Sequence, residues 1–399
     1  MRYIKVIMAA WVIYASFYLC RVNYSVALPF INSELGITFT SLGIIASAFF
    51  ISYSVGQVIN GYLGVKYRPW GLLIVSIVGS SVMSLLFGLS MSFPIFLALW
   101  LINGYFQSVG WPILVKVVAI ILSHGDLFKG YAIFNTSWAL GHALSWLLTG
   151  LIVEHYGWRW GFIINSMVFS VISIPLVLYL MRHVSSLKAT EPDADGSRNG
   201  SHHIMFRKHV VVLLVLALVY SIMYAIRYAL IVYLPSYVHY VERHISTFLI
   251  TIVLFPISGS IGMISLGFLF NKVVMQRRLM LITAISILIA VLLLTFPLCF
   301  EESIVLGLIN LTLLGASLYG AESQLASAIP VALIGRKYSS LAAGIIDSAG
   351  SIGAFISSLI SGMIIDSLGF NAMLRFWGYM EMVSLILLLA LIVIIKKTY

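Results

Sequence analysis

Long apolar runs separated by short polar segments follow one another along almost the whole chain. Each run is close to the length that an α-helix needs to cross the hydrocarbon core of a bilayer, about 20 residues. The pattern predicts an all-α membrane protein. Its twelve transmembrane helices are expected at residues 6–30, 41–64, 71–91, 94–122, 130–154, 159–181, 210–239, 245–271, 279–300, 304–334, 340–366 and 371–395.

One polar segment is much longer than the others. Residues 182–209 are rich in charge, Gly, Ser and His, a composition typical of a solvated linker. It divides the chain nearly in half. We therefore predict an N-terminal six-helix half at residues 1–181, a linker at 182–209 and a C-terminal six-helix half at 210–399.

The two halves repeat one another. At a constant offset of 206 residues, the pattern of the first predicted helix returns in the seventh, with Tyr14, Tyr18, Arg21 and Pro29 matched by Tyr220, Tyr224, Arg227 and Pro235. At the same offset the second and eighth helices align, and near 212 the fifth and eleventh do. Parallel six-helix repeats related by an axis along the membrane normal are the architecture of major facilitator transporters, with the substrate site at the midplane between the halves.

Composition supports this class and excludes others. Hydrophobic residues make up 61% of the chain and charged residues only 9%, whereas soluble domains carry roughly 25% charged residues. The two cysteines have no metal-binding or redox spacing, and no hydrolase, metalloprotease or P-loop motif occurs where it could act. We expect no enzymatic activity, no cofactor and no metal ion. The first apolar run has no small-residue cleavage site, so we expect it to be retained.

The net charge of +10 does not indicate nucleic-acid binding. If the twelve helices alternate in direction, most Lys and Arg residues outside them fall on one side, which the positive-inside rule assigns to the cytoplasm. We therefore expect a monomeric multi-pass protein of the plasma membrane, with both termini and the linker cytoplasmic.

Several motifs resemble those of a known family. The segments GYLGVKYR (61–68) and GFLFNKVVMQRR (267–278) are similar to the Gly-x-Leu-x-Asp-Arg loop of the major facilitator superfamily. More narrowly, FYLCRVNYSVALP (17–29), NGYFQSVGWP (103–112) and YAIRYALIVYLPSY (224–237) resemble the organophosphate:phosphate antiporters, which include the glycerol-3-phosphate and hexose-phosphate transporters. The resemblance implies alternating-access transport, with the arginines matching Arg21 and Arg227 as the phosphate-binding pair.

The residues themselves support an anion site. Tyr14, Tyr18 and Arg21 are spaced to share one helical face, and Tyr220, Tyr224 and Arg227 repeat this spacing. A guanidinium binds phosphate or carboxylate oxygens with a bidentate fork, and phenol hydroxyls can donate further hydrogen bonds. Since a charge inside the bilayer is costly, we expect both arginines to bind substrate.

Intramembrane acids provide the alternative. Glu322, Asp347 and Glu381 could neutralise the arginines, and all three lie in the second half. Glu322 and Asp347 are also candidates for carrying coupling protons, whereas we expect Glu381 to be structural.

Two positions depart from the antiporter pattern. The family has a lysine where this chain has Gln57 and a histidine where it has Trp138, although His142 lies one turn beyond and could substitute or be satisfied by a carbonyl. Gln107 is expected to line the cavity, and Lys116 stands at the position of a family arginine. The missing lysine leaves room for a monovalent anion.

The sequence thus predicts a secondary transporter of a small organic anion. The preferred solute is a phosphorylated metabolite exchanged for inorganic phosphate. The alternatives are a proton-coupled symporter of a carboxylate such as a sugar acid, and a non-transporting membrane sensor built on the same scaffold.

Overall fold

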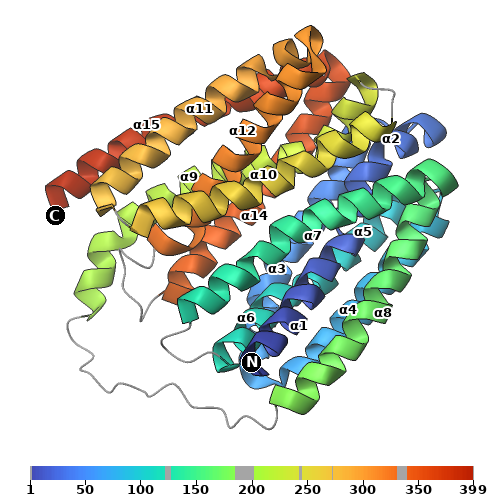
Figure 1. Ribbon diagram of the computed structural model, residues 1–399, viewed down its shortest axis with the longest axis horizontal. Helices are drawn as coiled ribbons and strands as arrows, with labels where there is room; N and C mark the ends of the chain where they lie inside the picture. Colours follow the sequence, from blue (N-terminus) through green and yellow to red (C-terminus); the bar gives the residue numbers. More distant parts are fainter. Residues whose placement is uncertain are drawn as a thin grey trace. The chain divides into compact units, whose positions relative to one another are not determined.

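The computed structural model describes residues 2–121, 127–184, 202–241, 245–271, 273–329 and 339–398, and these ranges are almost entirely helical (Figure 1). Within them, twelve helical spans are long and apolar enough to cross a membrane, so the predicted fold class is confirmed. The helices are α1 (Arg2–Phe17), η1 (Tyr18–Cys20), α2 (Asn23–Leu35), α3 (Phe39–Lys66), α4 (Pro69–Leu89), α5 (Phe93–Gln107), α6 (Gly110–Ile121), α7 (Leu127–Tyr156), α8 (Trp158–Val184), α9 (His202–Val241), α10 (Ile245–Asn271), α11 (Met275–Glu302), α12 (Ile304–Ser323), η2 (Gln324–Ala328), α14 (Ser339–Leu368) and α15 (Phe370–Thr398).

The chain forms two compact units. The first takes in the described residues of Met1–Glu191 and Ile231–Val253, and the second those of Pro192–Leu230 and Leu254–Tyr399. Of the predicted linker, residues 185–201 lie outside the described residues.

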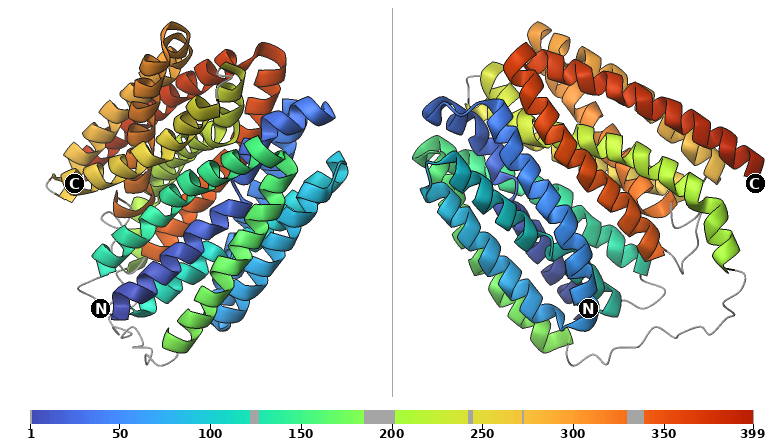
Figure 2. Two further views of the ribbon diagram at one scale, coloured as in Figure 1. Left: turned by 45° about the vertical axis from the view of Figure 1, so that its right-hand side comes forward. Right: turned by 180° about the vertical axis from the view of Figure 1, so that it is seen from behind.

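In the first unit, α1 packs against both α7 and α8, and α4 lies beside α5 and α8 (Figure 2). Aromatic rings fill the space between these helices. The ring of Phe87 stacks on Phe162 at 4.5 Å between centroids and lies 5.1 Å from Trp100, and all three side chains are buried. Large aromatic rings bury much apolar surface, and the outward helix faces carry exposed Ile, Leu and Val side chains suited to lipid.

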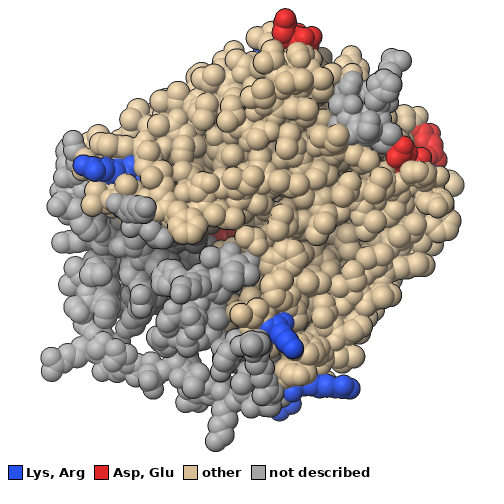
Figure 3. Space-filling model, in the orientation of Figure 1, with Lys and Arg blue, Asp and Glu red and all other residues tan. Residues whose placement is uncertain are grey.

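In the second unit, α11 runs alongside α12 and α15, and α14 also packs on α15 (Figure 2). Gly353 of α14 stands against the backbone oxygen of Ser221 in α9, where a larger residue would collide. Small residues at such crossings let membrane helices approach closely. On the face that Figure 3 shows, most of the visible described Lys, Arg, Asp and Glu residues lie toward the margins.

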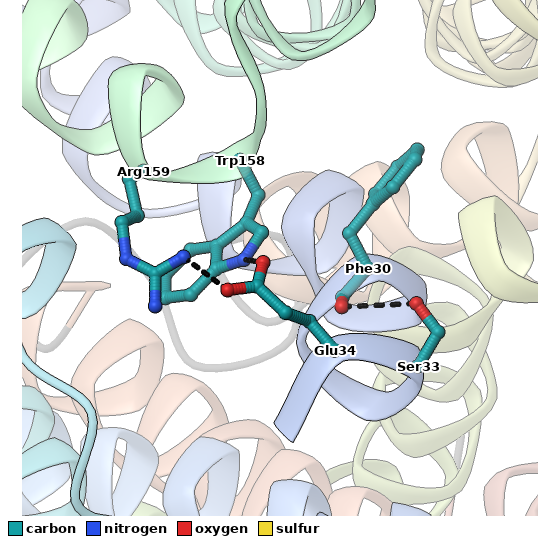
Figure 4. A network of polar contacts seen from close by, with 5 residues as sticks. All are labelled: Phe30, Ser33, Glu34, Trp158 and Arg159. Atoms are coloured by element: carbon teal, nitrogen blue, oxygen red, sulfur yellow. Dashed lines mark hydrogen bonds and ion pairs between the residues drawn. The ribbon is translucent and has the colours of Figure 1, made fainter. Parts of the chain in front are cut away.

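A polar contact ties the end of the first span to the start of α8 (Figure 4). Glu34, in the last turn of α2, accepts hydrogen bonds from Trp158 Nε1 at 2.7 Å and Arg159 Nη1 at 2.5 Å. The Arg159 guanidinium also covers the Trp158 ring, 4.3 Å from its centroid. Directly after this turn, Gly36 ends the helix with φ at 64°, a left-handed conformation that glycine adopts without steric cost.

Candidate functional site

The first span is broken in its middle, where the sequence predicted one continuous helix. α1 ends at Phe17, a single 3₁₀ turn follows, and α2 begins only after a turn at Arg21 and Val22. A break inside a membrane leaves backbone carbonyls without their helical partners, and these must be satisfied by the protein. Side chains do this here for two carbonyls, since Gln107 Nε2 donates to Phe17 O (3.1 Å) and Asn103 Nδ2 to Cys20 O (2.8 Å). Tyr18 O and Val22 O accept from backbone N–H groups and also from Ser145 Oγ (2.8 Å) and Ser25 Oγ (2.7 Å).

Arg21 lies at this break and is buried, with 7% of its surface exposed. Its Nε and Nη2 atoms both donate to Gln107 Oε1, at 3.1 and 3.0 Å. The guanidinium carbon also lies 4.7 Å from the ring centroids of both Tyr18 and Tyr53, which is cation–π distance. These contacts of the guanidinium, with one amide oxygen and two phenol rings, are all to neutral groups.

Gln107 is itself held from two sides. Gln107 is the last residue of α5. The fourth span is interrupted after it, as the first span is at Arg21, because α6 starts only at Gly110. Its Nε2 donates to Ser80 Oγ at 2.7 Å, and Ser80 Oγ donates to Asn103 Oδ1 at 2.7 Å. All three polar side chains are buried. The result is a fixed amide oxygen that orients Arg21.

The other predicted residues of the first unit lie nearby. The rings of Tyr14 and Tyr18 meet edge to face at 5.8 Å, and Tyr18 lies 4.4 Å from the His142 ring. His142 Nδ1 is 3.1 Å from the backbone oxygen of Trp138, one turn earlier on α7. Gln57 is half-buried on α3, four residues after Tyr53 and therefore on the same helical face.

Arg227 of the second unit has a different kind of partner. It lies within the uninterrupted helix α9, is 4% exposed, and forms a buried ion pair through its Nε with the carboxylate of Glu322 near the end of α12. Its guanidinium carbon lies 4.5 Å from the ring centroid of Tyr224, 4.7 Å from that of Tyr228 and 5.2 Å from that of Tyr319. Burying both charges is tolerable because they neutralise each other.

The remaining predicted residues surround this pair. The Tyr220 ring lies 5.4 Å from Tyr224, and its hydroxyl donates to Asp347 Oδ1 of α14 at 3.4 Å. Two residues after Glu322, α12 gives way to the π-helical segment η2. π-Helical turns are rare and often mark functional sites.

Within each unit, the predicted residues gather around the arginine of that unit. The two units hold their arginines by different partners. Sequence reasoning missed Tyr53, Ser80 and Tyr319, whose roles depend on contacts between separate helices. The side chain of Lys116, predicted as a possible arginine substitute, lies outside the described residues.

Comparison with known proteins gives a family match and several relatives. The profile of the Major Facilitator Superfamily matches residues 10–324. A probable hexose phosphate transport protein of Chlamydia trachomatis is 28% identical over 164 residues, 41% of this chain and 36% of that protein. The membrane sensor protein UhpC of Salmonella typhimurium is 28% identical over 173 residues, 43% of this chain and 39% of that protein. The matched segments therefore span less than half of these relatives, and they confirm the predicted resemblance.

Among solved structures, a bacterial homologue of the human lysosomal transporter Spinster, in an inward-facing and unoccupied conformation, superposes with a TM-score of 0.77. The alignment covers 98% of this chain and 96% of that one, at 14% sequence identity. At this identity the similarity shows the fold alone, which is that of a transporter with two six-helix repeats.

Proposed function

Because this chain belongs to the Major Facilitator Superfamily, we propose that it moves a small phosphorylated metabolite across the plasma membrane in exchange for inorganic phosphate. That it is a multi-pass membrane transporter, and not an enzyme, follows from the family itself. The nature of the solute and the exchange are the proposal. The observation that carries it is the buried arginine in each unit, Arg21 and Arg227, each set among tyrosine rings.

The chemistry of Arg21 favours an anion. Its Nε and Nη2 atoms donate to the neutral amide oxygen of Gln107, which orients the guanidinium without adding a negative charge. Arginine at a membrane-embedded position is expensive and marks a functional site by default. Phosphate oxygens match the geometry of the fork better than a single-point acceptor does.

The relatives support the phosphorylated class of solute. The Chlamydia protein is a probable hexose phosphate transport protein, and a hexose phosphate combines a dianionic head with a sugar that aromatic faces can pack against. Tyr14, Tyr18, Tyr220 and Tyr224 would supply such faces and hydroxyl donors. We further propose that both termini are cytoplasmic, since basic residues between spans concentrate on that side.

A second candidate rests on the Arg227–Glu322 ion pair. An anion that binds Arg227 must compete with the Glu322 carboxylate, and protonation of Glu322 would remove that competitor. Such a carrier would take up a carboxylate or phosphate together with a proton. This candidate predicts transport that depends on a pH gradient, whereas exchange does not.

Reconstituted protein decides between them. Liposomes containing the purified full chain are preloaded with inorganic phosphate, and uptake of labelled phosphate is followed with and without a pH gradient. The proposal is supported if uptake requires internal phosphate, does not depend on the pH gradient, and is inhibited by glucose 6-phosphate or glycerol 3-phosphate. Uptake driven by the gradient alone supports the proton-coupled candidate. Binding of a sugar phosphate without any transport would favour a sensor, and no binding of any phosphate would refute the anion site.

A further inference from the structure

In each unit, an aromatic ring from another helix covers the arginine guanidinium. The helix that carries this ring differs between the two units. In the first unit the ring is Tyr53 of α3, 4.7 Å from the Arg21 guanidinium carbon. In the second unit the position matching Tyr53 at the constant offset of 206 residues is Gly259. There the ring over Arg227 is Tyr319, at 5.2 Å, and it comes from α12.

Gly259 provides the space that Tyr319 occupies. A Cβ atom built on Gly259 would lie 2.7 Å from Cδ1 of the Tyr319 ring, far inside van der Waals contact. Tyr319 cannot move away easily, since it is completely buried and packs edge to face on Phe255 with 5.3 Å between centroids. A side chain at 259 and the ring of residue 319 therefore exclude each other.

Both rings have a phenylalanine neighbour at matching positions of the repeat. Phe255 matches Phe49 at the same offset, and Phe49 stacks on Tyr53 at 5.8 Å, as Phe255 packs on Tyr319. In both units a glycine brings the next helix close: a Cβ on Gly104 would strike the backbone oxygen of Phe49, and a Cβ on Gly315 that of Phe255.

The residue four positions after each of these glycines also differs in size between the two units. It is the small Ser108 after Gly104, and the large Tyr319 after Gly315. Tyr53 and Ser108 of the first unit thus correspond to Gly259 and Tyr319 of the second. An aromatic ring therefore covers the arginine in both units, but it belongs to α3 in the first unit and to α12 in the second.

We propose that Tyr319 is a positioning residue for Arg227, and that Gly259 is required to admit it. The consequence is that α12 holds Arg227 by two side chains, since Tyr319 and Glu322 lie three residues apart on one helical face. Arg21 is instead held from two helices, by Tyr53 of α3 and Gln107 of α5. Displacement of α12 would therefore release Arg227 from both of these contacts at once. The role in substrate binding rests on the function proposed above, but the positioning itself does not.

Chemical labelling of the arginines tests the positioning directly. The purified full chain is treated with phenylglyoxal, and modification of Arg227 and Arg21 is quantified in the same sample by mass spectrometry. Tyr319→Leu should raise labelling of Arg227 about threefold or more and leave Arg21 unchanged, because the ring over Arg227 is lost. Tyr319→Phe keeps the ring and should label as wild type does.

Matched variants separate positioning from loss of structure. Tyr53→Leu should raise labelling of Arg21 and not of Arg227. Gly259→Ala should push the Tyr319 ring aside and expose Arg227, whereas Gly267→Ala, on the same helix with its nearest neighbour atom 3.8 Å away, should not. In the exchange assay, Tyr319→Leu should raise the KM for glucose 6-phosphate more than it lowers kcat.

The proposal is overturned if Arg227 labels equally in wild type and Tyr319→Leu, if Tyr319→Phe behaves like Tyr319→Leu, or if both arginines become reactive together. A wild-type protein that exchanges no phosphate would remove the proposed function. The labelling results would still decide the role of Tyr319, because they require no transport.

Discussion

Replacing Gln107 with glutamate tests whether the charge around Arg21 governs anion binding. The two side chains have nearly the same shape, and a carboxylate oxygen would take the place of Oε1, which accepts from Arg21 Nε at 3.1 Å and Nη2 at 3.0 Å. The hydrogen bond from Nε2 to Phe17 O would be lost, as it also is in the Gln107→Leu control. Arg21 would then have an ionised partner, as Arg227 has in Glu322. The guanidinium would stay in position, but its charge would be neutralised.

The size of the effect follows from Coulomb's law. An anion bound to the guanidinium on the edge away from Gln107 would lie roughly 6 Å from the new carboxylate, and two unit charges at that distance repel by about 3 kcal/mol at an effective dielectric constant of about 20. Since 1.4 kcal/mol is a factor of about ten, binding should weaken about 100-fold. Gln107→Leu is the neutral control. It removes two hydrogen bonds to Arg21, worth about 0.6 kcal/mol each in membrane proteins, so it should weaken binding less than about tenfold.

The assay is equilibrium binding of labelled inorganic phosphate and glucose 6-phosphate to purified protein in detergent. Thermal unfolding of each variant without ligand shows whether the fold is retained. Near-wild-type affinity in Gln107→Glu, or a loss no greater than that of Gln107→Leu, would refute the reasoning. It would mean that Arg21 does not face the bound anion.

Three further outcomes are expected in thermal unfolding of the purified protein. Glu322→Gln should lower the free energy of unfolding by on the order of 3 kcal/mol, because it removes the ionised partner of Arg227. Added phosphate should then stabilise this variant more than it stabilises the wild type, and equal stabilisation of both would contradict this expectation. Gly104→Ala should destabilise by about 1–3 kcal/mol because its Cβ strikes the Phe49 backbone oxygen, whereas Gly71→Ala, with open space around it, should not. Glu34→Gln should cost less than about 1 kcal/mol because the ion pair is largely exposed, and a larger loss would show that this contact is buried in the membrane-embedded protein.

The helical spans could be predicted closely because lipid imposes both their length and their composition. The predicted helix at 71–91, for example, corresponds to α4 at Pro69–Leu89. The paired arginines were equally visible, since a charge in an apolar run stands out and the repeat places the second one at a constant offset.

The break at Tyr18–Cys20 could not be predicted in the same way. It lies in an apolar run without glycine, and it is stable because side chains far along the chain, such as Gln107 and Asn103, satisfy its carbonyls. The unequal partners of the arginines depend likewise on which face of the fourth and tenth spans meets them. Gly259 could be seen as a mismatch to Tyr53, but only the packing shows that Tyr319 replaces the ring.

The most direct test of the central claim, that Arg21 and Arg227 bind the transported anion, is phosphate exchange by the two single variants Arg21→Lys and Arg227→Lys in liposomes. Lysine keeps the charge but replaces the bidentate fork with a point charge. We predict that each variant folds as wild type does by size-exclusion chromatography and loses at least about 100-fold in exchange rate. Wild-type exchange by either variant would contradict the account.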